Sequence, residues 1–579
     1  MKNQVHPNLK TSSKMNYKNQ HNSINSNSFF SQKKVKLIYS IALLLIGTSL
    51  FYLYLPVINY GFIPVAFILL ILLILSGFIF TSFEISLKTK QIINIKRPNK
   101  LFIICIILIA CYITIIPLLT SHPIFRNQKY RNLIGSVKTK DKILSSIAPI
   151  SIDEIRVVDE ELAYLLGEKI LGTQPSLGSQ VELGDFCIQK VKNKLYWVAP
   201  LLHSGFFKWF YNTEGTNGYV MVSATNERDV QLIQHSDGKD IKIKYQQGAY
   251  FQSEIHRHVY LSGYVTSGLT DFSFEIDDKG KPYWIITKYT KKIGFSGDDA
   301  NGVLVVDAKT GDIRSYSLKN IPYWIDRVHP ISFIEEQLNN WGEYVHGYWN
   351  FSNSNKLKIT EGLTLVYGKN NKSYWYTGLT SVGKEESAVG FVLVDTRTKE
   401  TTFYQQGGAT EFAAQSSAEG KVQEKGYNAS LPIPYNINNI PTYVMTLKDE
   451  GGLVKMYAMV AISDYTIVGV GNTLRETLSS FKNSYNMADN KLTTTQVESS
   501  NCISSIVTRI QNDVKNGNSF YYFKVKDYPK IFVGSSQLSP EIPVTIPGDS
   551  IKISFDIDGE EIIDVIKFEN LDLYRKIKK

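Results

Sequence analysis

Two histidines stand two residues apart, at His256 and His258, and such a pair could ligate a transition metal. Residues at this spacing share one face of a strand but lie on different faces of a helix. We expect the surrounding segment, 251–262, to lie in or near a helix, and the sequence contains no HExxH or CxxC motif. No metal-ligating residue is therefore assigned.

Nucleophilic catalysis has one candidate stretch, His203-Ser204-Gly205, which is followed by Lys208 and Glu214. An activated serine needs a base within hydrogen-bonding distance and a third group that orients this base. The sequence does not reveal where those groups lie, so a hydrolase site in this insertion stays open. GFSGDDANG (294–302) lacks the Lys-Ser/Thr of a phosphate-binding loop. No catalytic or cofactor-binding residue is assigned, and no cofactor is expected.

Aromatic residues gather in two stretches, HSGFFKWF (203–210) and WGEYVHGYW (341–349). Exposed aromatic side chains beside sheets suit contact with another protein, whereas buried ones fill cores. His346 lies in the second stretch and is expected to be a packed loop histidine.

An aspartate that could act as a catalytic carboxylate ends the apolar strand of GVLVVDAKTGDI (302–313). The same pattern recurs three times, and the aligned residues are Ser223, Asp307, Asp395 and Ala461. Because two copies lack the carboxylate, we expect a structural role. Asp307 and Asp395 should open turns in which the side chain accepts hydrogen bonds from nearby backbone N–H groups.

A second repeated pattern precedes each of these strands: KLYWVAP (194–200), KPYWIIT (281–287) and KSYWYTG (372–378), with a worn copy at PTYVMTL (441–447). The distance between the two patterns varies, which indicates two strands joined by a hairpin loop of changing length. Adjacent strand residues point to opposite faces. We therefore expect one ring of each pair to pack on a helix and the other to meet a neighbouring unit or solvent. The pairs are Tyr196/Trp197, Tyr283/Trp284 and Tyr374/Trp375.

A helix candidate precedes each strand pair, so each unit should be one helix packed on a small antiparallel sheet. The helix candidates are 159–170, 251–262, 331–341 and 411–426. The unit resembles the PepSY domain family through this helix, the Tyr-Trp strand and the strand-turn-strand VLVVDAKTGDI (303–313). The resemblance covers roughly residues 150–481 in about four copies, and 411–481 is the best preserved.

The resemblance to PepSY domains implies extracytoplasmic, non-catalytic modules. Some members of that family are inhibitory pro-regions of secreted peptidases, and others belong to membrane-anchored proteins of the cell envelope. The resemblance implies no catalytic residues. The expected units are 121–240, 241–328, 329–408 and 409–483.

Three stretches near the N-terminus contain no charged residue: Leu37–Ile58, Gly61–Phe83 and Leu101–Thr120. A hydrocarbon core about 30 Å thick needs about 20 helical residues, so residues 35–120 are expected to form three transmembrane helices. Residues 1–34 hold six Lys, seven Asn and no acidic residue, which predicts a disordered tail.

Charge near the helix ends predicts the orientation. Basic residues flank the first helix at Lys33, Lys34 and Lys36, and the 84–100 loop holds five more, which places both cytoplasmically. Arg126, Lys129 and Arg131 follow the third helix and compete with this signal. The large remainder is then extracytoplasmic.

The net charge of +10 is confined to the membrane-proximal part. Residues 1–120 hold twelve Lys or Arg against one Glu, whereas residues 121–579 hold 51 basic and 52 acidic residues. The basic residues suit contact with the lipid bilayer, and the remainder has no electrostatic signature of nucleic-acid binding.

The C-terminal part should be a linker, 484–502, followed by a small β-barrel, 503–579. Short strands separated by turn residues, among them SFYYFKV (519–525) and IPGDSIKISF (546–555), resemble those of an OB-like barrel. The four cysteines are Cys105, Cys111, Cys187 and Cys502, and a disulfide between the last two stays open. Sparse cysteine in an external region indicates a bacterial protein.

The expected fold class is α+β, with three transmembrane helices, repeated helix-plus-sheet units and a barrel. The expected function is binding or scaffolding at the cell envelope, through a protein partner that the sequence does not identify. That role could restrain a peptidase or organise an assembly, and an extracytoplasmic hydrolase is the alternative.

Overall fold

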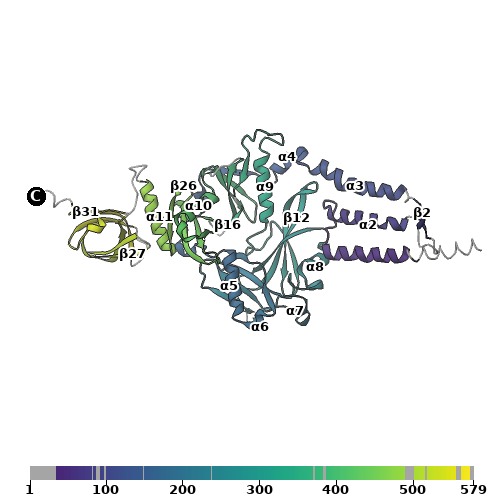
Figure 1. The fold of residues 1–579 in the computed structure, drawn as a ribbon, viewed down its shortest axis with the longest axis horizontal. Coiled ribbons are helices and arrows are strands. Elements are labelled where there is room, and N and C mark those ends of the chain that lie inside the picture. Colours follow the sequence, from purple (N-terminus) through teal and green to yellow (C-terminus); the bar gives the residue numbers. More distant parts are fainter. Residues whose placement is uncertain are drawn as a thin grey trace, which may run out of the picture.

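The chain is mixed α+β, with several separate sheets. The computed structural model describes residues 34, 36–80, 82–85, 92–96, 100–147, 149–236, 238–360, 362–368, 372–382, 387–489, 501–515, 518–536, 538–555 and 562–573. Apolar helices lie at one end, helix–sheet units lie in the middle, and a barrel lies at the opposite end (Figure 1). The predicted tail, 1–34, falls outside the described residues apart from residue 34.

Two helices in the described part of the chain are long and apolar enough to cross a membrane: Lys36–Tyr54 and α3 (Lys100–Ser121). The second apolar stretch, Gly61–Phe83, forms the shorter helix α2 (Pro64–Phe80) of 17 residues. At 1.5 Å per residue α2 is about 25 Å long, against a hydrocarbon core of about 30 Å. The sequence predicted three helices of spanning length, and the described residues form two helices of that length and a shorter one. The segment starts late because Pro64 suits a first helical turn, and the Asn59 side chain holds Gly61 in the preceding turn.

The three helices pack against one another and end at the second sheet. Gly47 lies against Leu72, and Gly77 lies against Phe102, so small residues allow close approach. A hairpin of β1 (Ser82–Ile85) and β2 (Ile92–Lys96) lies between α2 and α3 in the chain.

Hydrogen bonds join the helices to the second unit. The Tyr260 hydroxyl donates to the Pro56 carbonyl oxygen at 2.6 Å, and the Phe295 backbone N–H donates to Ser121 Oγ at 2.8 Å. The Phe295 ring packs edge-to-face on Tyr112 of α3, with 5.6 Å between the ring centroids. The end of the helix group is therefore seated on this sheet.

Four sheets follow in chain order, each preceded by a helix, and among the described residues all their strand pairs are antiparallel except one in the third sheet. The first unit has α5 (Glu160–Gly172) and the order β4-β6-β7-β8 with β5 beside β6: β4 (Val181–Leu183), β5 (Cys187–Val191), β6 (Lys194–His203), β7 (Tyr219–Ser223), β8 (Val230–Ile233). The second has α8 (Ile255–Val259), a π-turn at Tyr260–Tyr264, and the order β11-β12-β13-β14: β11 (Gly268–Ile276), β12 (Pro282–Ile293), β13 (Ser296–Asp307), β14 (Ile313–Ser317).

The third and fourth units repeat this plan. The third has α9 (Ile331–Glu343), β15 (Leu357–Ile359), β16 (Thr364–Tyr367), β17 (Ser373–Ser381), β19 (Gly390–Asp395) and β20 (Thr401–Tyr404). The fourth has α10 (Glu411–Lys421), β22 (Asn428–Ala429), β23 (Ile433–Ile437), β24 (Ile440–Lys448), β25 (Val454–Ala461) and β26 (Asp464–Gly471). Shorter elements lie between them: α6 (Pro175–Gly178), α7 (Phe206–Tyr211), and the two-stranded ladders β9 (His235–Ser236) with β10 (Lys239–Asp240) and β18 (Ser387–Ala388) with β21 (Gly408–Ala409).

One hydrogen-bond arrangement recurs in all four units. In the second unit the Ala308 carbonyl oxygen accepts from the backbone N–H groups of Lys244 and Tyr245, and the Trp284 indole N–H donates to the Tyr245 carbonyl oxygen at 2.7 Å. Trp197 and Trp375 make the equivalent bonds at 2.8 and 2.9 Å, to Val158 and His329. In the fourth unit the hydroxyl of Tyr443 donates to the Ala409 carbonyl oxygen at 3.3 Å in place of an indole. The sequence repeat is thus a repeat of structure.

Within each Tyr-Trp pair the two side chains point to opposite faces of the sheet, as the strand period requires. The three tryptophans are buried, and Trp284 is only 2% exposed, whereas their tyrosine neighbours are half-buried. Trp284 shares a core with Ile255 and Val259 of α8. The expectation that these pairs are core elements is confirmed for the tryptophans.

Strand β3 (Val137–Lys140) departs from the expected boundaries. It pairs in parallel with β20 of the third unit, although the sequence placed it in the first. It follows α4 (Pro123–Arg131), and the nearby Ile134 and Ile143 are buried. The chain between the apolar helices and the first unit is therefore an integral part of the third sheet.

The fourth unit contacts the first unit directly. Lys448, whose side chain is buried, lies 2.6 Å from Asp159 and 2.8 Å from Glu161 at the start of α5. The backbone N–H of Arg156 donates to the Tyr435 hydroxyl at 3.1 Å. These contacts bring together segments almost 290 residues apart.

Helix α11 (Leu474–Asp489) packs on β26, so the first residues of the predicted linker 484–502 are helical. Residues 490–500 lie outside the described residues. A closed five-stranded barrel follows in the order β27-β28-β29-β31-β30, with β29 and β31 parallel: β27 (Asn501–Lys515), β28 (Asn518–Val525), β29 (Tyr528–Ser535), β30 (Ser550–Phe555), β31 (Ile562–Asn570). The possible disulfide is absent: Cys187 is buried, Cys502 is exposed, and both are free thiols.

Candidate functional site

The two histidines considered for metal binding both lie on α8, and their rings contact different partners. His256 Nδ1 lies 2.6 Å from Glu254 Oε1, whereas His258 Nε2 lies 2.8 Å from the Gly311 carbonyl oxygen. Among the described residues, no group of three or more His, Cys, Asp or Glu side chains could hold a metal ion. His258 thus joins α8 to the turn after β13, and His256 joins the cap of its own helix.

The structure does not assemble the nucleophile–base pair considered around Ser204. His203 is buried, and its Nε2 has no hydrogen-bond partner among the described residues. Burial lowers its pKa, which favours the neutral ring. In the part of the chain that the structure describes, no hydrogen bond joins the Ser204 hydroxyl to this ring. Lys208 lies on α7, and neither it nor Glu214 makes a hydrogen bond or ion pair with Ser204 there.

His346 is exposed, so the expectation of a packed loop histidine is wrong. Its Nε2 lies 3.2 Å from the side-chain nitrogen of Asn355, within the same surface loop.

The repeated aspartates are turn residues, as expected. Asp307 Oδ1 accepts hydrogen bonds from the backbone N–H groups of Lys309 and Thr310, at 2.9 and 3.0 Å. Asp395 Oδ1 accepts equivalent bonds from the second and third residues after it, at 3.0 and 2.9 Å. Lys281 also pairs with Asp307 at 2.5 Å, and this bond with the backbone bonds outweighs burial and holds the pKa of Asp307 below its usual range. The carboxylates fix hairpins and are not available for acid–base catalysis.

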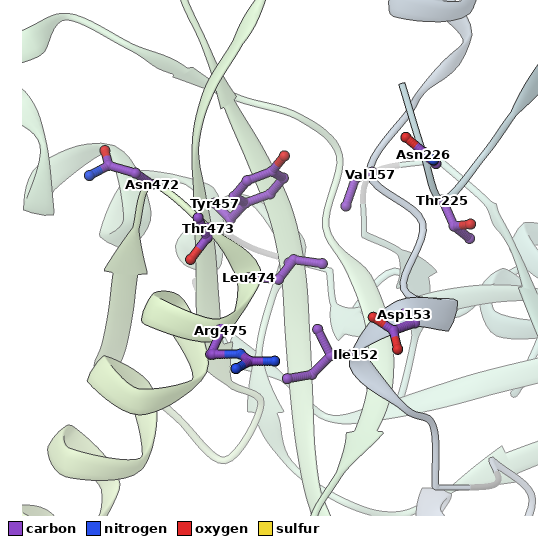
Figure 2. Close-up of a pocket in the computed structure, with 10 residues that line it drawn as sticks. All are labelled: Ile152, Asp153, Val157, Thr225, Asn226, Tyr457, Asn472, Thr473, Leu474 and Arg475. Carbon is purple, nitrogen blue, oxygen red and sulfur yellow. The ribbon is translucent and has the colours of Figure 1, made fainter. Parts of the chain in front are cut away.

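A polar pocket of about 540 Å³ opens between the first and fourth units (Figure 2). One wall belongs to the first unit and the loop before it, and the other belongs to β25 and the start of α11. Figure 2 shows three apolar side chains, Ile152, Val157 and Leu474, between the two polar walls. The polar lining residues are Asp153, Thr225, Asn226, Tyr457, Asn472, Thr473 and Arg475.

A capping box fixes the α11 wall of the pocket. Thr473 Oγ1 accepts the Glu476 backbone N–H at 3.2 Å, and the Glu476 carboxylate accepts the Asn472 backbone N–H at 3.1 Å. The helix start is therefore satisfied internally and carries a carboxylate. This end of α11 does not attract anions strongly.

The chemistry of the lining suits binding. Burial and the nearby charge of Glu227 raise the pKa of Tyr457, so its hydroxyl is a hydrogen-bond donor. Asp153 and Arg475 offer opposite charges from the two walls. Among the described residues that line the pocket there is no histidine or cysteine, and the lining combines an apolar floor with amide, hydroxyl and charged side chains.

A second polar feature is buried where the first three units meet. Arg327, in the chain between the second and third units, lies 3.8 Å from Glu275 of β11 and donates to Cys187 Sγ of β5. Burial outweighs the charge of Arg327 and raises the pKa of Glu275 to about 7, and it raises the pKa of Cys187 to about 12. Asp326 is affected in the same way, with a pKa of about 6. These groups hold the units together and are too enclosed to meet a large substrate.

Sequence reasoning missed both the pocket and this buried cluster. Each joins residues from units far apart in the chain, and no local motif marks such a contact. One signal was available: Thr473-Leu474-Arg475-Glu476 has the S/T-x-x-E pattern of a capping box and marks the start of α11.

No family model and no curated protein matches the sequence. The solved structures with some likeness include two mutants of the B. megaterium levansucrase, at 7% and 8% identity and TM-scores of 0.17 and 0.16. Each alignment covers 72% of this chain and 96% of the levansucrase chain. Scores this low carry no argument about fold or function.

Proposed function

We propose that the chain is a membrane-anchored, extracytoplasmic binding or scaffolding protein of the bacterial cell envelope. The four units and α11 hold the C-terminal barrel away from the membrane, where it can meet a protein partner. The units are PepSY-like and the barrel is OB-like in this proposal.

The observation that carries the proposal is the order of parts along the molecule. The apolar helices lie at one end and the barrel at the other, with the four units between them (Figure 1). Such an arrangement suits a spacer that presents a binding module at a set distance from a surface.

Three membrane crossings are part of the proposal. The helix α2 lies alongside the two longer helices (Figure 1), and its 17 residues reach the lower end of the spanning range. Large apolar side chains on these helices face outward, as Leu44 and Leu53 do at 67% exposure each. With three crossings and a basic cytoplasmic tail, the units and the barrel lie outside.

The pocket between the first and fourth units is the site where a partner segment would dock. Its two walls belong to distant parts of the chain, so occupation would also stabilise their association. The near-zero net charge of residues 121–579 argues against a nucleic-acid partner.

The hydrolase alternative lacks a supporting geometry. Among the described residues, the rings of His256 and His258 make structural contacts, and the His203 ring is buried without a hydrogen bond to Ser204. Partner binding retained after all three are changed would favour the scaffold. A hydrolytic activity lost in the same variant would favour the enzyme.

A membrane-impermeant crosslinker on wall-stripped cells tests the proposed function. The full chain should give a crosslinked species of defined mass. A chain ending at residue 489 and the variant Leu474→Arg should reduce it, whereas Leu453→Arg, at an exposed turn, should not. Identical species from all four chains, or none from any, would contradict the proposal.

A further inference from the structure

Large aromatic side chains are exposed on α7 and in the segment beside it. Phe207, Phe210 and Tyr211 are 71%, 59% and 86% exposed, and Phe251 is 58% exposed. Inside this group, Trp209 packs on Tyr250 and Phe251, with ring centroids 5.6 and 5.7 Å apart. The inner rings thus hold the outer ones in place.

Contacts connect this group to the outer end of the first apolar helix. Arg257 donates to the Phe251 carbonyl oxygen at 2.9 Å, and the same guanidinium lies 4.4 Å from the centroid of the Tyr52 ring. Tyr52 is two residues from the end of the helix Lys36–Tyr54. The aromatic group is therefore adjacent to the level at which this helix would leave the bilayer.

A second exposed aromatic group lies next to the end of α3. The His122 ring, directly after α3, has its centroid 6.2 Å from that of Tyr348, and Tyr348 packs on Trp349 at 5.2 Å. Trp349 and Phe351 are 65% and 78% exposed. Figure 1 shows α7 and α4 on opposite sides of the apolar helices, at the ends of these helices that contact the second unit.

We propose that these two groups, the aromatic rim, rest in the headgroup region of the lipid bilayer on either side of the helices. The rim is defined by Phe207, Phe210, Tyr211, Phe251, Trp349 and Phe351. This inference rests on the proposed membrane anchoring and adds a second membrane contact, made by the units themselves.

The physical argument is continuity of position and composition. Headgroup regions extend about 5–7 Å beyond each side of the hydrocarbon core, and Trp and Tyr concentrate there because one end of each ring system is apolar and the other is polar. Lys208, on α7, can direct its ammonium group to lipid phosphates while its stem lies along the rings. Lipid would bury the apolar surface of the aromatic side chains at this level, which is otherwise exposed to water. A lipid surface accounts for both groups at once, whereas a protein partner would have to reach both sides of the helices.

Depth-dependent quenching in the full chain tests the rim. The chain is placed in phosphatidylcholine–phosphatidylglycerol nanodiscs with Cys105, Cys111 and Cys502 changed to serine, and Cys187 stays buried and unlabelled. A fluorophore is attached singly through Phe207→Cys, Trp349→Cys, Phe412→Cys or Leu44→Cys. Phe412, 60% exposed on α10, is the aromatic control away from the rim, and Leu44 reports on the first helix.

Headgroup-located nitroxide lipids should quench the probes at 207 and 349 several-fold more than the probe at 412, and chain-located nitroxide lipids should quench the probe at 44. Equal quenching at 207, 349 and 412, with the probe at 44 still quenched, would overturn the rim and leave the anchor intact. An unquenched probe at 44 would overturn the anchor and the rim together.

Discussion

The guanidinium group of Arg257 lies 4.4 Å from the centroid of the Tyr52 ring, which joins α8 of the second unit to the first apolar helix. Arg257 also donates to the Phe251 carbonyl oxygen, and it lies 3.8 Å from Glu254. One side chain thus connects the first apolar helix, a surface loop and the cap of α8.

Replacing Arg257 with alanine should loosen α8 from the helix. A partly desolvated cation–π contact is worth about 0.5–2 kcal/mol. The free energy of local opening at residues 255–264, measured by hydrogen exchange, should therefore fall by about the same amount. The exposed Lys239→Ala serves as the control. Unchanged exchange in Arg257→Ala would show that the contact does not hold the helix.

Removing Trp284 should destabilise the second unit strongly. Its ring is 2% exposed, and its indole N–H bonds the Tyr245 carbonyl oxygen, so Trp284→Ala should cost about 3–5 kcal/mol of unfolding free energy. Trp284→Phe should cost less, because phenylalanine retains most of the buried aromatic surface. Some cost should remain, because the Tyr245 carbonyl oxygen loses its hydrogen bond.

Calorimetry of the two variants beside Lys194→Ala measures this cost. Lys194 is exposed at the start of β6, whereas Lys281 is a poor control because it pairs with Asp307. A melting temperature for Trp284→Ala equal to that of Lys194→Ala would remove the tryptophan from the core.

The buried carboxyl group of Glu275 should make stability depend on pH. Its folded pKa, about 7, is above its ordinary value near 4.5, so the folded state binds the extra proton between these values. Stability from this group is fully present below about pH 4.5 and is lost as the pH rises through about 7. His329, whose pKa burial lowers to about 4, acts in the opposite direction between pH 4 and 6.5.

Comparison with Glu275→Gln isolates the carboxyl group. Relative to this variant, the wild-type protein should lose about 2–3 kcal/mol of unfolding free energy between pH 5 and pH 8, as denaturant titrations would measure. Parallel pH profiles of the two proteins would show that Glu275 is ionised in the folded state throughout.

The first residue of a fragment that lacks the apolar helices should affect the stability of that fragment. A fragment 150–579 lacks β3 and the buried Ile134, Ile143 and Ile147, whereas 123–579 keeps them. Each buried isoleucine contributes about 1.5–3 kcal/mol, so the longer fragment should melt at a clearly higher temperature. Equal melting temperatures would mean that β3 is not integral to the third sheet.

Local patterns predicted the elements of the fold well. The Tyr-Trp strands, the aspartate turns and the helices before them could be recognised because strand period and turn chemistry are local properties of the chain. The start of α2 was misjudged because composition alone does not show that Asn59 turns the chain before Pro64. The linker was misjudged because α11 is held by packing on β26, whereas its sequence is polar.

The candidate pocket could not be predicted. Leu474 lines the pocket together with Ile152 and Val157, and contacts of Lys448 and Tyr435 bring the fourth unit to the first. Likewise, Cys187, Glu275 and Arg327 meet from three segments with no shared motif. Contacts between units depend on how whole sheets associate, and short patterns do not encode that.

Labelling of Cys502 tests the central claim most directly, namely an anchored chain with its barrel outside the cytoplasm. Cys502 is exposed on the barrel, Cys187 is buried with a pKa raised to about 12, and Cys105 and Cys111 lie in α3. A membrane-impermeant maleimide added to wall-stripped, unlysed cells should therefore label the wild-type chain, and Cys502→Ser should abolish the label. Labelling that appears only after lysis would contradict the account.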